Sequence, residues 1–154
     1  MAKRALKRHL TFKTILKVTL IVIVSMVGLG ALGSLVSYIG FNASMKLAKS
    51  LAKVEKTEVL EPIVDEGTGV VTFRTDRDFK VLQLTDTHIG AGFASIKKDA
   101  WAINAIAEMV SYTKPDLVIV TGDMVYPVPF QSGTINNLNA TKLFAATMES
   151  LGVY

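Results

Sequence analysis

The sequence has no cysteine, which excludes disulfide bonds and metal sites built on thiolates. Histidine is also scarce, because His9 and His88 are the only two in the chain. No Asp or Glu precedes Glu55, and no charged residue of either sign lies between Val18 and Met45. These absences divide the chain into a basic, strongly apolar N-terminal part and a polar C-terminal part.

The overall net charge of +4 hides this division. Residues 1–54 contain nine Lys or Arg, whereas the remainder contains eight against thirteen Asp or Glu, so its net charge is 8 − 13 = −5. A mildly acidic domain has little electrostatic attraction for phosphate backbones. We therefore expect no nucleic-acid-binding surface.

The apolar stretch from Val18 to Tyr38 is about the length that crosses a bilayer as a helix. Basic residues precede it, which predicts a single-pass signal anchor at 18–39 after a cytoplasmic segment at 1–17. The C-terminal domain would then be extracytoplasmic. The alternative is a cleaved signal peptide, cut among the small residues of 31–37, although such peptides usually have a shorter apolar core.

Residues 40–68 are interpreted as a juxtamembrane linker before a domain at 69–154. Within it, the lysine-containing stretch 42–60 either continues the helix or acts as a spacer, and Pro62 ends any helix there.

The domain at 69–154 has the pattern of an α/β fold. Strands are expected at 69–75, at 79–84 and at 117–121, and helices at 97–113 and 139–152; 125–137 is expected to be a loop, and Val153 and Tyr154 to begin another strand. Val81, Leu82 and Leu84 form an apolar run typical of a strand covered on both faces. The residues expected to face the core are Trp101, Ile103, Ile106, Ala107, Met109 and Val110 of the first helix and Leu143, Phe144 and Leu151 of the second.

Candidate metal ligands follow two of these strands. In an extended chain, Asp86 and His88 would point to the same side, and a carboxylate beside an imidazole suits Zn, Mn or Fe. Asp123 follows the next strand, and a βαβ unit makes the two strands parallel, so that their carboxyl ends meet at one edge. The alternative is that Asp86 and Asp123 only cap turns and His88 is a hydrogen-bonded residue at a strand end.

Two sequence blocks here resemble a known family. Leu84-Thr85-Asp86-Thr87-His88 and the later run from Lys114 to Asp123, ending in Thr121-Gly122-Asp123, are similar to the D-x-H and G-D motifs of the calcineurin-like metallophosphoesterases. The resemblance covers about residues 70–154. It implies the first βαβ portion of a metallophosphoesterase-type α/β sandwich, and hydrolysis of a phosphate mono- or diester.

The resemblance also implies a cofactor, namely two divalent metal ions (Mn, Fe or Zn) that activate water for attack on phosphorus. Residues matching Asp86 and His88 bind the first metal in that family, and the one matching Asp123 bridges both. The family's G-N-H block and later histidine motifs have no counterpart in this sequence. We therefore expect an incomplete fragment whose coding region continues after Tyr154, and little activity from these 154 residues alone.

Tyr126 fits the G-D-x-x-Y pattern of purple acid phosphatases, in which the tyrosine binds iron. Those enzymes have glycine where this chain has His88, so a packing or loop role for Tyr126 is favoured. Two other functions compete with the phosphoesterase. One is a non-catalytic, membrane-tethered binding or scaffold module, and the other is a basic membrane-binding peptide fused to a passive domain.

Overall fold

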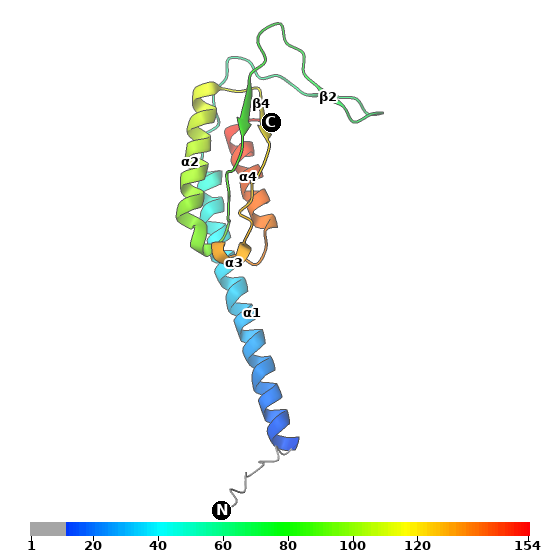
Figure 1. Ribbon diagram of the computed structural model, residues 1–154. Coiled ribbons are helices and arrows are strands. Elements are labelled where there is room, and N and C mark those ends of the chain that lie inside the picture. The colour runs from blue at the N-terminus through cyan, green and yellow to red at the C-terminus, as the bar shows by residue number, and fades with distance from the viewer. Residues whose placement is uncertain (1–11) are drawn as a thin grey trace, which may run out of the picture.

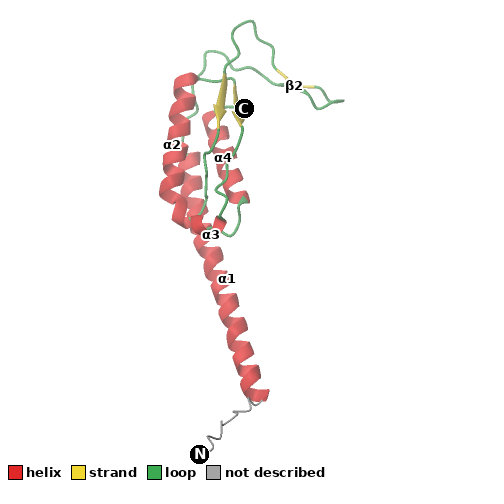
Figure 2. Ribbon diagram, in the orientation of Figure 1, coloured by secondary structure: helices red, strands yellow, loops and turns green. Residues whose placement is uncertain are grey.

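One continuous helix joins the N-terminal part of the chain to its C-terminal domain (Figure 1). The computed structural model describes residues 12–154; residues 1–11, with His9 and most of the expected cytoplasmic segment, lie outside this range. The elements follow in this order: α1 (Phe12–Lys49), β1 (Ile63–Val64), β2 (Val71–Thr72), β3 (Val81–Leu84), η1 (Phe93–Ser95), α2 (Ile96–Thr113), β4 (Leu117–Val120), α3 (Pro129–Ser132) and α4 (Leu138–Leu151). Figure 2 shows that helices make up much more of the structure than strands do.

The helix α1 has two different halves. By length and composition it could cross a membrane, and residues 12–32 are exposed along their whole length. Ser37, Gly40, Ser44 and Ala48 are buried against the domain, at helical spacing and all with small side chains. The expected boundary between spanning segment and linker, after residue 39, thus falls inside α1, and the first part of 42–60 continues the helix as far as Lys49.

A small parallel sheet lies at the centre of the domain. β3 pairs with β4 in register from Val81–Leu117 to Leu84–Val120, and α2 forms the crossover, which confirms the expected βαβ unit. Leu82 and Leu84 face the helices, whereas Val81 is 49% exposed on the other side. The expectation of a strand covered on both faces was wrong, because α1, α2 and α4 pack together on one face of the sheet only.

The helices α2 and α4 bury the faces that their periodicity predicted, with two exceptions. Trp101 is 64% exposed and Met109 is 40% exposed, so neither is a core residue. Trp101 lies two positions from Ile103, and residues two apart on a helix point in different directions. The residues confirmed as buried are Ile103, Ile106, Val110, Leu143, Phe144 and Leu151.

The expected strand at 69–75 is reduced to the two residues of β2, which pair with β1 as a separate antiparallel ribbon. A local turn holds this ribbon together, because the Asp65 carboxylate accepts hydrogen bonds from the backbone N–H groups of Gly67 and Thr68. All four strand residues are exposed. At the other end of the chain, the Val118 N–H donates to the carbonyl of Tyr154, which places the end of the chain beside β4 without forming an assigned strand.

Candidate metal centre

The segments that follow β3 and β4 remain joined to each other beyond the ends of the strands. The backbone N–H of His88 donates to the carbonyl of Asp123 at 3.0 Å, and that of Ile89 to Met124 at 2.9 Å. An isolated parallel bridge between Ile89 and Val125 extends the pairing. These bonds fix the two ligand-bearing segments side by side, at the carboxyl edge of the sheet.

All three candidate ligands have an uncommon backbone conformation. Asp86, His88 and Asp123 have positive φ angles of 54°, 47° and 23°. Such angles are costly for residues other than glycine, and they are found disproportionately at functional sites. The sequence analysis expected an extended chain to place Asp86 and His88 on the same side, and that reason was wrong, because β3 ends at Leu84. Left-handed backbone at both residues directs their side chains instead.

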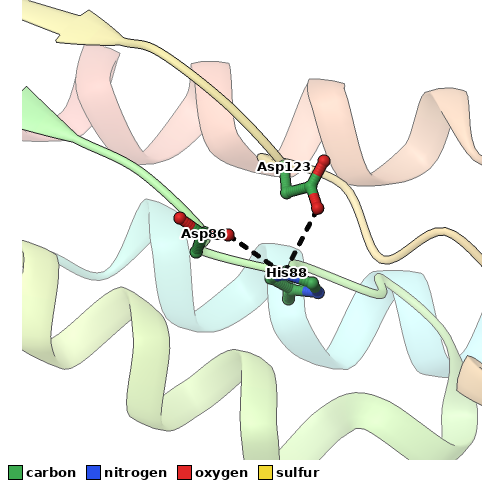
Figure 3. A group of neighbouring side chains, drawn as sticks. All are labelled: Asp86, His88 and Asp123. Atoms are coloured by element: carbon green, nitrogen blue, oxygen red, sulfur yellow. Dashed lines mark ion pairs between the residues drawn. The ribbon is translucent and has the colours of Figure 1, made fainter.

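These turns bring the three side chains together (Figure 3). His88 Nε2 lies 3.7 Å from Asp86 Oδ1 and 3.8 Å from Asp123 Oδ2. One donor atom from each residue lies within 4.8 Å of the other two, and all three residues are exposed. Two carboxylate oxygens and an imidazole nitrogen at this spacing could hold one divalent metal ion, and the donor set suits Zn, Mn or Fe.

Neighbouring hydroxyl groups orient the ligands. Thr85 Oγ1 donates to Asp86 Oδ2 at 2.6 Å, and Thr87 Oγ1 donates to the carbonyl of Met124 at 3.0 Å. The first bond holds one carboxylate oxygen of Asp86 and leaves Oδ1 directed toward His88. The second ties the residue between the two ligands to the segment that follows Asp123.

Asp99 is a supporting residue that the sequence analysis missed. It is 1% exposed, and its carboxylate accepts hydrogen bonds from the backbone of Gly90 and Ala91 and from the hydroxyls of Ser95 and Ser44. Burial raises the pKa of Asp99, while the hydrogen bonds oppose that rise. The residue links the loop after His88 to both α1 and α2. Its place in the first turn of a helix gave no sign of this, because an acidic residue is common there.

The contacts of Tyr126 indicate a role other than metal binding. Its hydroxyl hydrogen-bonds to Gln131 Oε1 at 2.8 Å, and its ring meets that of His88 edge-on, with 6.1 Å between the centroids. A pocket of about 140 Å³ lies beside His88, and its other lining residues include Lys98, Tyr126, Gln131 and Ser132. Tyr126 therefore forms a wall next to the ligand cluster.

Comparisons of the chain with protein-family models, with curated proteins and with solved structures give no match. The geometry of the site and the motifs of the sequence are thus the basis for any functional conclusion.

Proposed function

We propose that this chain forms the first part of a metal-dependent phosphoesterase anchored in a membrane by α1. The observation that carries the proposal is the meeting of Asp86, His88 and Asp123 at the carboxyl edge of two parallel strands. Parallel α/β sheets place their ligands at this edge. The same three residues are those that the resemblance to calcineurin-like metallophosphoesterases assigns to metal binding.

The ligands differ in what they can hold. Asp86 and His88 would hold one metal, together with Oδ2 of Asp123. The second carboxylate oxygen of Asp123 points away from His88 in Figure 3, so the residue could serve a second metal as well. Two such divalent ions would supply Lewis-acid polarisation of a phosphoester and activation of water.

The lining of the pocket beside His88 suits a substrate that carries a phosphate group. Lys98 lines it, and an ammonium group near a metal site favours an anionic group such as phosphate. Tyr126 and Gln131 contribute further polar atoms to the same wall. Within residues 12–154, the three-ligand cluster falls short of a full two-metal set, so we expect weak metal binding and slow hydrolysis from this chain by itself.

The test measures manganese-dependent hydrolysis of p-nitrophenyl phosphate and bis-p-nitrophenyl phosphate in mild detergent. The 154-residue chain is compared with the chain extended by whatever its gene encodes after Tyr154. Hydrolysis that depends on the extension and is lost in Asp123→Asn supports the enzyme. Metal binding without hydrolysis by either form would favour the alternative, a membrane-tethered binding or scaffold module.

The proposed orientation places the N-terminus in the cytoplasm and the domain outside, because the basic residues precede the apolar stretch. The absence of native cysteine makes this easy to test. A single cysteine at Tyr112→Cys, which replaces an exposed residue of the domain, should react with an impermeant maleimide in intact cells. Lys13→Cys should react only after permeabilisation; the reverse pattern would refute the orientation.

A further inference from the structure

Four large apolar side chains are exposed at the end of the domain from which the exposed half of α1, residues 12–32, emerges. Phe93, Phe130, Ile135 and Leu138, here called the apolar collar, are between 54% and 79% exposed. They come from η1, α3, the loop between α3 and α4, and the start of α4; Figure 1 shows α3 at this end of the domain. Single exposed apolar residues are normal, but a group of them at one place marks an interaction surface.

The collar is in contact with α1 or close to it. A Cβ on Gly33 would lie 3.9 Å from the Ile135 side chain, and a Cβ on Gly40 would collide with the backbone of Phe93. Ser37 Oγ and Thr134 Oγ1 share a buried hydrogen bond of 2.8 Å between the two segments. The apolar surface of the exposed half of α1 therefore continues directly onto the collar.

The length of α1 decides how far the collar stands from a membrane. Lys17 is the last charged residue before the apolar stretch, and at about 1.5 Å per residue the 16 residues from Lys17 to Gly33 rise only ~24 Å. The hydrocarbon core of a bilayer is about 30 Å thick. A span that begins at Lys17 therefore ends near Ser37, which is already hydrogen-bonded to the domain.

The charges near this end also suit a membrane surface. Residues 89–98 and 124–148 contain no Asp or Glu, whereas Lys97, Lys98 and Lys142 fall within them. The carboxylates nearest in sequence are the candidate metal ligands, the buried Asp99, and Glu149, which is exposed at the other end of α4 from Leu138. Basic and apolar side chains together are the composition of segments that lie in the interface of a bilayer with anionic lipids.

We infer that the apolar collar inserts into the bilayer around α1, so that the domain rests on the membrane instead of standing away from it on a helical stalk. The occupant of the collar is lipid, at the level of the headgroups and the first acyl carbons. This docking would hold the pocket beside His88, whose wall includes Gln131 and Ser132 of α3, next to the headgroup layer. The inference does not depend on the proposed phosphoesterase activity.

The experiment uses the full chain reconstituted in vesicles of phosphatidylcholine and phosphatidylglycerol in a ratio of about three to one, a composition that provides anionic headgroups. The native tryptophan is removed by Trp101→Phe. A single tryptophan is then introduced by Phe130→Trp in the collar or, as the matched control, by Tyr112→Trp. Tyr112 is 89% exposed near the far end of α2.

Fluorescence is measured with lipids brominated on the acyl chains and, separately, with iodide in the aqueous phase. We expect the brominated lipids to quench the fluorescence of the Phe130→Trp variant roughly twofold or more and to leave that of the Tyr112→Trp variant unchanged, with iodide showing the opposite preference. Equal access of iodide to both positions would overturn the inference. Protection of the Phe130→Trp variant from both quenchers would also overturn it, because another protein surface would then cover the collar.

Discussion

The imidazole of His88 lies 3.8 Å from a carboxylate oxygen of Asp123, although all of α2 and β4 separate the two residues in the sequence. The backbone N–H of His88 also donates to the carbonyl of Asp123. The parallel pairing of their segments thus holds the two side chains together. The geometry of the candidate metal centre depends on this pairing.

The first prediction concerns the ligands. Because changes around metal ligands cost about 10- to 100-fold in affinity, Asp86→Asn and Asp123→Asn should each weaken Mn²⁺ binding at least about tenfold. Titration calorimetry of the full chain in detergent measures this. Glu108→Gln removes an exposed carboxylate from α2 and should leave the affinity unchanged. Equal affinities in all three variants would show that the cluster does not bind the metal.

The second prediction compares two glycines of α1. A Cβ on Gly40 would collide with the backbone nitrogen of Phe93, whereas a Cβ on Gly30 has nothing within 4 Å. Gly40→Ala should therefore lower the free energy of unfolding by about 1–3 kcal/mol, since overpacking forces the helix and η1 apart. Gly30→Ala should be neutral or slightly stabilising, because alanine favours a helix. Denaturant unfolding in detergent is the measurement, and equal midpoints for the two variants would contradict the packing of α1 on η1.

The third prediction concerns Asp99. An asparagine there would turn an amide NH₂ toward groups that themselves donate, the backbone N–H groups of Gly90 and Ala91 among them. Asp99→Asn should cost about 1–3 kcal/mol of stability. It should also weaken Mn²⁺ binding, because the loop after His88 loses its anchor; Asp76→Asn, at an exposed position, serves as the control. If Asp99→Asn were stable and its metal affinity unchanged, Asp99 would have no positioning role.

The fourth prediction is a dependence of stability on pH. Two hydrogen bonds of 2.8 Å from Arg77 lower the pKa of the Asp116 carboxyl to about 2. Because the pKa of an unfolded aspartate is about 3.9, this contribution is present above about pH 4 and is lost as the pH falls toward the folded value. Asp116→Asn should be less stable at neutral pH by about 1–3 kcal/mol and should show a smaller loss of stability on acidification.

Unfolding curves measured from pH 7 down to about pH 2, across both pKa values, test the fourth prediction. Asp65→Asn provides a comparison, since Asp65 also has a lowered pKa, owing to hydrogen bonds from Thr68 and Gly67, but is exposed in the separate β1–β2 ribbon. If the stability of Asp116→Asn changed with pH in parallel with that of the unchanged chain, the stabilising role given to the Arg77–Asp116 ion pair would be contradicted.

Periodicity and segregated charge in the sequence were sufficient to predict the apolar helix, the crossover helix α2 and the two parallel strands. Each of these depends on the local order of apolar and polar residues, which tertiary contacts did not override. The spacing of the Asp86, His88 and Asp123 blocks also predicted their meeting at one edge, because the topology of a βαβ unit permits few other arrangements.

Only the tertiary structure decided the rest. The sequence could not show that α1 continues into the core, since the small residues from Ser37 to Ala48 acquire their meaning from what packs against them. It could not show that Trp101 faces solvent, or that Asp99 holds the loop after His88. The left-handed backbone at the three candidate ligands is likewise set by the pairing of two distant segments. Contacts between residues far apart in the chain determine these features, and no local pattern encodes them.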